Sequence, residues 1–231
     1  MHIPDGYLGP QTCVAGYATM LPAWALASRH LGRHLRGRQV PLLAQGAAFS
    51  FVIMMFNVPI PGGTTGHAVG AVLVAVLLGP WAACVAVSVA LVVQALLFGD
   101  GGVTAIGANC FNMAFVMPFT GYAVYRLIAG RACAKSRRHW IGAGIGGYVG
   151  LNVAALLAGI EFGVQPLIAH DAAGHALYAP YPLAVAVPVM ALEHLLVFGI
   201  VEAVVTALVV AYLQRTDPRL VAGGAELEAS K

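Results

Sequence analysis

Charged side chains are scarce in this sequence: Asp, Glu, Lys and Arg make up 9% of its 231 residues, while 60% are hydrophobic. Soluble domains are about one quarter charged, so this composition excludes an ordinary soluble domain. A helix needs roughly 20 apolar residues to cross the bilayer core, which allows about six to eight spans and leaves no room for a soluble domain. We therefore expect an all-α, polytopic membrane protein that lies in a lipid bilayer and does not bind nucleic acid.

The sequence also lacks the short motifs that would give the chain chemistry of its own. There is no phosphate-binding P-loop pattern, so an energy source would have to lie on another chain. There is no H-E-x-x-H pattern, and an intramembrane metalloenzyme would need a general base beside an open metal position. The four cysteines have no C-x-x-C spacing and are expected to pack as small apolar residues. We expect neither an enzyme nor a resident cofactor.

Apolar stretches separated by short polar loops occupy most of the chain. They cover roughly residues 10–28, 40–56, 67–78, 81–98, 103–128, 140–160 and 183–213. If these are seven crossings with the N-terminus outside, all twelve Lys and Arg residues fall on the cytoplasmic side, as the positive-inside rule requires. We expect about seven transmembrane helices, a cytoplasmic C-terminus and a multi-pass location in the inner (plasma) membrane. Residues 1–222 are expected to form one transmembrane domain, and residues 223–231 a short flexible cytoplasmic tail.

The first two residues, Met1 and His2, turn the amino terminus into a metal chelator. The Met1 amine, the His2 backbone nitrogen and the His2 imidazole follow one another along one short stretch of chain. With the His2 amide deprotonated, all three close a five-membered and a six-membered ring around one divalent ion. Met1–Pro10 has neither the basic nor the apolar region of a signal peptide, and histidine is too bulky for routine removal of the initiator methionine. We therefore expect a free Met1 amine.

A second outer stretch, residues 57–67, is shaped by two prolines and three glycines and ends at His67. It is predicted to lie on the same membrane face as Met1 and to present His67 at the head of a short helix. His67 would then supply the fourth nitrogen that the terminal chelate lacks. Four nitrogens, three of them held planar by covalent bonds, suit Ni(II) or Cu(II), whereas Zn(II) prefers a tetrahedron.

Residues near these ligands in sequence are candidates to support them. The N-terminal segment 1–9 is expected to follow a fixed path back toward the membrane, because its prolines, its glycine and its apolar residues do not suit a solvated tail. Asp5 is too close in sequence to reach the same ion easily, so we assign it a supporting or capping role. Asn57, at the start of the second outer stretch, and Thr65, two residues before His67, are further supporting candidates.

Several polar residues fall within the apolar stretches. Glu193, His194 and Glu202 are functional candidates because ionisable groups are costly in a membrane, although packing or a subunit contact is favoured over a transport pathway. Glu193 and His194 are neighbours that point about 100° apart, so they are not expected to face one partner. Asn109 and Asn112 are expected to hydrogen-bond between helices, and the alternative is that one of them supports the outer loops.

The N-terminal sequence Met-His-Ile-Pro-Asp-Gly-Tyr-Leu and the stretch Pro-Gly-Gly-Thr-Thr-Gly-His ending at His67 resemble the NikM/CbiM family. The residues Asp-Gly-Gly at 100–102 and Gly-Ala-Asn-Cys-Phe-Asn-Met at 107–113 are also similar to that family. Its members are the metal-capturing membrane components of energy-coupling-factor transporters for nickel and cobalt. Pro4-Asp5 and Thr65-Gly66-His67-Ala68 are closer to the nickel branch than to the cobalt branch.

The resemblance implies that Met1, His2 and His67 hold the ion. It further implies a small membrane partner of the NikN/CbiN type, a transmembrane coupling subunit of the NikQ/CbiQ type and a cytoplasmic ATPase of the NikO/CbiO type. The expected function is ATP-driven capture of Ni²⁺ as a transported substrate, with the same role for Co²⁺ as the alternative. A membrane metal sensor is a more distant alternative, because the inner loops and tail are too short for an output module.

Overall fold

The computed structural model describes residues 1–35, 37–133 and 135–221. Its helices in chain order are α1 (Pro10–His34), α2 (Val40–Met54), α3 (Ala71–Leu78), α4 (Pro80–Val93), α5 (Ile106–Cys110), α6 (Met117–Ala129), α7 (Arg138–Gly163), α8 (Gln165–Ile168), α9 (Leu183–Glu193) and α10 (Gly199–Thr216). A 3₁₀ turn, η1 (Gly37–Gln39), precedes α2, and π-helical turns occur at η2 (Gln94–Phe98), η3 (Phe111–Val116) and η4 (His194–Phe198). Short strands β1 (Val58–Pro59) and β2 (Thr65–Gly66) form an antiparallel pair. The expected class, a helical membrane protein, is confirmed.

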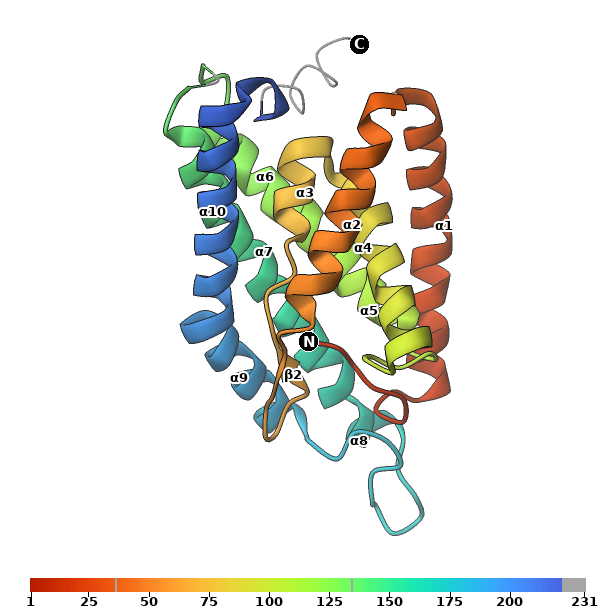
Figure 1. The fold of residues 1–231 in the computed structure, drawn as a ribbon. Coiled ribbons are helices and arrows are strands. Elements are labelled where there is room, and N and C mark those ends of the chain that lie inside the picture. The colour runs from red at the N-terminus through yellow and green to blue at the C-terminus, as the bar shows by residue number, and fades with distance from the viewer. Residues whose placement is uncertain (36, 134, 222–231) are drawn as a thin grey trace.

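Helix α7 lies at the centre of the bundle and packs on α6, α9 and α10 (Figure 1). Close packing depends on its glycines, because small residues let helix backbones approach each other in a membrane. A Cβ atom at Gly150 would lie 2.7 Å from the carbonyl oxygen of Met117, and one at Gly146 would overlap the carbonyl oxygen of Gly121. The aligned glycines of α7 therefore set the distance to α6.

Three continuous helical stretches in the described part of the chain are long and apolar enough to cross a bilayer by themselves: Pro80–Phe98, Arg138–Ile168 and Leu183–Thr216. The helix Val40–Met54 is apolar but shorter. α3 has only eight residues, and Ala71 to Val76 are buried, so this short helix is covered by protein. Such an interrupted helix is tolerated where protein satisfies its backbone groups.

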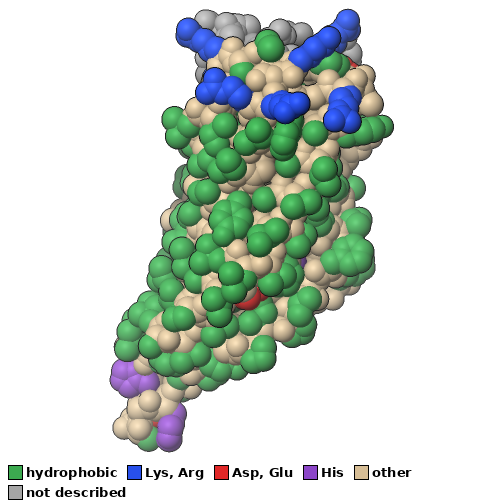
Figure 2. Space-filling view, turned by 90° about the vertical axis from the view of Figure 1, so that its left-hand side faces the viewer, with side chains coloured by type: hydrophobic (Ala, Val, Ile, Leu, Met, Phe, Trp, Pro, Cys, Tyr) green, Lys and Arg blue, Asp and Glu red, His purple; other side chains and the backbone are tan. Residues whose placement is uncertain are grey.

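The described Lys and Arg side chains gather at one end of the bundle (Figure 2). The described basic residues are Arg29 and Arg33 in α1, Arg126 in α6, Arg131, Lys135, Arg137 and Arg138 before or at the start of α7, and Arg215 and Arg219 at or after the end of α10. Histidine side chains lie at the opposite end in the same view. The fold therefore segregates positive charge along its long axis.

Two sequence-based boundaries differ from the structure. His67 does not begin a helix: it lies in extended chain after β2, and α3 starts at Ala71. The reason is Gly70, whose φ of +74° ends the extended segment and begins the helix from a left-handed conformation. The predicted flexible tail, residues 223–231, lies outside the described residues.

Candidate metal centre

The N-terminal segment folds back into the bundle (Figure 1). Met1 is 1% exposed, His2 3% and Ile3 0%, so the first three residues are core residues. The backbone of Ile3 is held on both sides by Asn109: its N–H donates to Oδ1 (2.9 Å) and its carbonyl accepts from Nδ2 (3.1 Å). The N–H of Gly102 also donates to the Ile3 carbonyl (2.9 Å). These contacts hold the N-terminal segment against the bundle.

The second outer stretch meets the N-terminus through β2. Val58 pairs with Gly66, and Pro59 pairs with Thr65, which fixes the course of the chain just before His67. The Met1 amine donates hydrogen bonds to the carbonyl oxygen of Thr65 and to its Oγ1, the latter at 3.0 Å. Thr65 thus touches the terminal amine directly.

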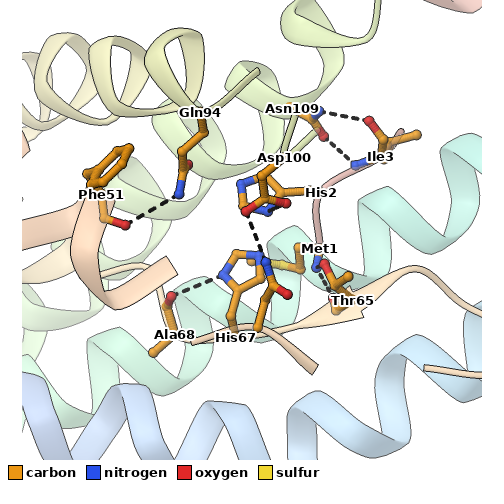
Figure 3. A network of polar contacts seen from close by, with 11 residues as sticks. Met1, His2, Ile3, Phe51, Thr65, His67, Ala68, Gln94, Asp100 and Asn109 are labelled. Carbon is orange, nitrogen blue, oxygen red and sulfur yellow. Dashed lines mark hydrogen bonds and ion pairs between the residues drawn. The ribbon is translucent and has the colours of Figure 1, made fainter. Parts of the chain in front are cut away.

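The imidazoles of His2 and His67 stack, with ring centroids 4.5 Å apart and planes 21° from parallel (Figure 3). His67 is fully buried, and its Nδ1–H donates to the carbonyl oxygen of Ala68 (3.0 Å). Its Nε2 is buried and has no hydrogen-bond partner. A histidine that ligates a metal usually donates its other ring N–H to a carbonyl or carboxylate, and His67 has that arrangement.

Asp100 lies beside His2 and was not among the residues expected from the sequence. Its Oδ1 is 3.2 Å from Nδ1 of His2, and its Oδ2 accepts a hydrogen bond from Nδ2 of Asn57 (2.9 Å). Asn57 therefore orients a carboxylate that faces a candidate ligand. The sequence did carry one signal for Asp100: it is an acidic residue between glycines, in a stretch predicted to lie on the outer side. Gly99 and Gly101, on either side of it, adopt positive φ.

Gln94 is a second residue that sequence reasoning missed. It is fully buried at the start of η2, its Nε2 donates to the carbonyl oxygen of Phe51 (3.3 Å), and its Oε1 has no partner (Figure 3). π-helical turns occur often at functional sites because they redirect side chains. The turn at Gln94 places an amide beside the stacked imidazoles.

Asp5 has a capping role and does not contact the stacked histidines. Its carboxylate accepts hydrogen bonds from the backbone N–H groups of Val103 (3.0 Å) and Thr104 (2.9 Å) and from the Thr104 hydroxyl. The Thr104 hydroxyl holds the pKa of Asp5 below its usual range. Asp5 thus fastens the N-terminal segment to the loop that carries Asp100.

The two asparagines predicted as contacts between helices have different roles. Nδ2 of Asn112 donates to Oε2 of Glu161 in α7 (2.7 Å), which is a contact between helices as expected. Asn109 instead holds the backbone of Ile3, so the favoured interpretation is wrong for this residue and the alternative is correct. Sequence spacing places both on neighbouring turns but does not say which element each faces.

Glu202 supports the segment after His67. It is fully buried, and its carboxylate accepts the backbone N–H groups of Val69 (2.8 Å) and Gly70 (3.0 Å). These N–H groups precede α3 and have no partner within that helix, so the carboxylate acts as its cap. The expectation of a packing role for Glu202 agrees with these contacts.

Glu193 and His194 do come together, contrary to the expectation from their helical positions. Oε1 of Glu193 lies 2.5 Å from Nδ1 of His194. The same ring nitrogen donates to the carbonyl oxygen of Met190 (2.8 Å).

Five of the other histidines lie apart from this site. His170 and His175 belong to an exposed loop between α8 and α9, where Nδ1 of His175 lies 3.1 Å from Oδ2 of Asp171. His30 and His34 stack on each other in α1, and His139 lies 2.8 Å from the Tyr125 hydroxyl. Within the described residues, no three His, Cys, Asp or Glu side chains form a group that could hold a metal ion. The candidate centre has the two imidazoles of His2 and His67, and its other donors would be the Met1 amine and the His2 backbone nitrogen.

The electrostatics of the site favour unprotonated nitrogen. Burial lowers the pKa of the Met1 amine to about 4 and also lowers the pKa of His2. Nitrogen must be unprotonated to coordinate a metal. The Met1 amine, the His2 amide and imidazole and the His67 imidazole could therefore serve together as donors to one divalent ion.

The chain is similar to proteins that are named for the transport of metals. The chain is 61% identical over 222 residues to the fused nickel transport protein NikMN of Rhodobacter capsulatus, covering 96% of this chain and 64% of that protein. It is 52% identical over 220 residues to the probable fused nickel transport protein LarMN of Lactiplantibacillus plantarum, covering 94% of this chain and 66% of that protein. This chain thus spans slightly less than two thirds of both fused relatives. A crystal structure of a truncated transition metal transporter superposes with a TM-score of 0.90 at 54% identity, covering 94% of this chain and 99% of that one.

The relatives named above belong to one class, transport proteins for nickel or for a transition metal. Residues 2–220 match the family model described as CbiM, cobalt uptake substrate-specific transmembrane region. The chain belongs to the CbiM family.

Proposed function

We propose that this protein is the substrate-capturing membrane subunit of an ATP-driven energy-coupling-factor transporter, and that Met1, His2 and His67 bind the transported ion. The observation that carries the proposal is the stacking of His2 and His67 beside a buried Met1 amine. Burying polar nitrogen without a partner is costly, and both ring nitrogens of His2 and Nε2 of His67 are buried without a hydrogen-bond partner. A divalent ion would take up the unpaired nitrogens.

Nickel is the proposed substrate and cobalt the alternative. The donor set of four nitrogens, three held planar by covalent bonds, suits the tetragonal preference of Ni(II). The Asp100 carboxylate beside His2 adds negative charge that would favour a divalent cation. Two relatives with high identity are named as nickel transport proteins, whereas the cobalt transport protein CbiM of Kyrpidia tusciae is 43% identical over 131 residues.

We further propose seven membrane crossings, with Met1 at the outer side and the C-terminus in the cytoplasm of a multi-pass inner-membrane protein. The gathering of Lys and Arg at one end supports this orientation. Residues 1–222 would form one transmembrane capture domain, with segment 1–9 folded back onto the metal site. No cofactor is proposed, because the ion is the cargo.

The proposed partners are a small membrane protein of the NikN/CbiN type, a coupling subunit of the NikQ/CbiQ type and an ATPase of the NikO/CbiO type. The fused names of the two nickel relatives support the first of these. The chain itself has no P-loop pattern, which supports an ATPase on another chain.

Uptake of radioactive Ni²⁺ by cells tests this function. Cells that express this chain with its coupling subunit, small partner and ATPase should accumulate nickel, and an ATPase variant without its P-loop lysine should not. A tenfold excess of unlabelled Co²⁺ should compete less well than unlabelled Ni²⁺. Accumulation that is equal with and without the active ATPase would contradict the proposal, and stronger competition by Co²⁺ would favour the cobalt alternative.

A further inference from the structure

A groove opens between α7 and α10 at the end of the bundle where Lys and Arg gather. Its volume is about 910 Å³, which lies within the range of sites that hold small molecules. Its lining includes three cations, Lys135, Arg137 and Arg215, and no Asp or Glu among the described residues. All three cations are exposed, and within the described chain none lies within ion-pair distance of a carboxylate. The basic end of the groove therefore carries uncompensated positive charge.

A hydrogen bond across the groove joins the two segments that carry these cations. Nε2 of Gln214, a buried residue of α10, donates to the carbonyl oxygen of Ser136 (3.0 Å). Ser136 lies between Lys135 and Arg137, and Gln214 directly precedes Arg215. The spacing of the backbone on the two sides of the groove is therefore fixed by a contact within the protein.

Farther from the basic end, the groove is apolar. Its wall on α10 consists of Val204, Ala207, Leu208 and Ala211. Val204 and Leu208 are exposed and lie one helical turn apart, on a side of the molecule where α9 and α10 present a largely hydrophobic surface (Figure 2). The two helices meet at Gly144 of α7, where a Cβ atom would lie 3.0 Å from Cβ of Ala207. The apolar wall thus faces the lipid.

Trp140 lines the groove between its basic and apolar parts. It lies near the start of α7, one turn after Arg137 and one turn before Gly144. Tryptophan is enriched at the level of the lipid headgroups, where its ring contacts apolar chains and its N–H meets polar groups. Positive charge, an aromatic ring and an apolar wall therefore follow one another along the groove. A phospholipid has its phosphate, its glycerol and its acyl chains in the same order.

We propose that this groove binds one anionic phospholipid, with its phosphate at Lys135, Arg137 and Arg215 and an acyl chain along α10. The inference goes beyond the proposed function, because it uses no residue of the candidate metal centre. Basic pockets between membrane helices bind the headgroups of acidic lipids. A zwitterionic lipid brings no net negative charge, so three cations without a carboxylate favour an anionic lipid over it.

Competition between two lipids for the purified full-length chain tests the inference. The chain is placed in detergent micelles with equal amounts of phosphatidylglycerol and phosphatidylcholine that have identical acyl chains, and native mass spectrometry counts the bound lipids. Wild type should retain one phosphatidylglycerol in preference to phosphatidylcholine. A basic residue near an acidic lipid contributes about fivefold to affinity, so Arg137→Gln combined with Arg215→Gln should weaken phosphatidylglycerol binding by more than about tenfold. Excess inorganic phosphate should not displace the lipid, because the apolar wall also contributes to binding.

The matched control is an exposed pair of arginines in α1 that does not line the groove. Arg29→Gln combined with Arg33→Gln removes the same charge from the same end of the bundle, and phosphatidylglycerol binding should remain close to that of wild type. Equal weakening in the two double variants overturns the inference, because net charge and not the groove would then hold the lipid. Displacement by inorganic phosphate also overturns it, because the site would then recognise phosphate alone. A wild type without preference for phosphatidylglycerol overturns it as well and favours an acidic segment of a partner protein as the occupant.

Discussion

His2 and His67 lie 65 residues apart in the chain, yet their imidazoles stack with centroids 4.5 Å apart. One ring belongs to a terminal segment that Asn109 holds by its backbone, and the other follows a strand pair and precedes a helix capped by Glu202. Each ring is therefore positioned by hydrogen bonds to its own backbone segment. The site is preorganised by elements that do not themselves contribute donors.

Extending the amino terminus should abolish metal retention. A single glycine placed before Met1 converts the amine to an amide and leaves every side chain in place, so the proposed chelate loses its first donor. The buried position of Met1, 1% exposed, also leaves no room for an added residue. The measurement is nickel content per protein after purification, and a carboxy-terminal tag of equal size is the control. Equal nickel in the two proteins would show that the terminus is not a ligand.

Replacing His67 by alanine should weaken nickel binding by more than about 100-fold, because loss of residues that only support a metal ligand already costs 10–100-fold. The three donors of the terminal chelate remain, so residual binding should be weak and unselective between nickel and cobalt. Titration of the purified variant with each metal measures both effects. His175→Ala, which alters an exposed histidine, serves as the control. Unchanged affinity in His67→Ala would remove His67 from the site.

Asn109→Ala should lower nickel affinity by about 10–100-fold although Asn109 is not a proposed ligand. The variant loses both hydrogen bonds that hold the backbone of Ile3, next to His2. Asn112→Ala is the matched control three residues away: it loses its bond to Glu161 and should reduce thermal stability while nickel affinity stays within about threefold of wild type. An affinity loss in Asn112→Ala as large as that in Asn109→Ala would mean that general destabilisation is responsible.

The hydrogen bonds that Asp5 accepts from Val103 and Thr104 should make the stability of the fold depend on pH. Because the Thr104 hydroxyl lowers the pKa of Asp5 in the folded protein, the carboxylate stabilises the fold above its unfolded pKa of about 4. That contribution is lost as the pH falls through the lower folded value. The melting temperature of metal-free wild type should therefore exceed that of Asp5→Asn by a constant amount from pH 7 to 5, and the difference should vanish at lower pH. The corresponding difference in the free energy of unfolding should be below about 1 kcal/mol, because Asp5 is exposed. A difference that grows on acidification would contradict this stabilising role of the Asp5 carboxylate.

Cysteine labelling should place the two ends of the bundle on opposite sides of the membrane. In a background with Cys133→Ser, which removes the exposed native thiol, Asp171→Cys should react with an impermeant maleimide in intact cells and Arg137→Cys should react only after the cells are opened. The physical reason is the retention of Lys and Arg on the cytoplasmic side. Labelling at position 137 in intact cells would overturn the proposed orientation.

The sequence by itself determined the class of protein and the candidate donors. A chain that is 60% hydrophobic and 9% charged, with long apolar stretches, favours helices buried in lipid, and the proposal of a terminal Met-His chelate follows from covalent geometry alone. These properties are local, so they do not depend on how distant segments pack. The prediction for His67 is local as well, because the prolines and glycines that shape the chain before it lie within a few residues of it.

Only the tertiary structure decided which residues surround the donors. Asp100, Gln94 and Asn109 come from different segments, and their contacts with the N-terminal segment depend on the packing of α4, α5 and α1. The start of α3 at Ala71, four residues after His67, likewise depends on Glu202, which lies more than 130 residues away and satisfies two backbone N–H groups. Hydrogen bonds between segments so distant in sequence leave no periodic pattern along the chain, and they become visible only when the helices are placed against one another.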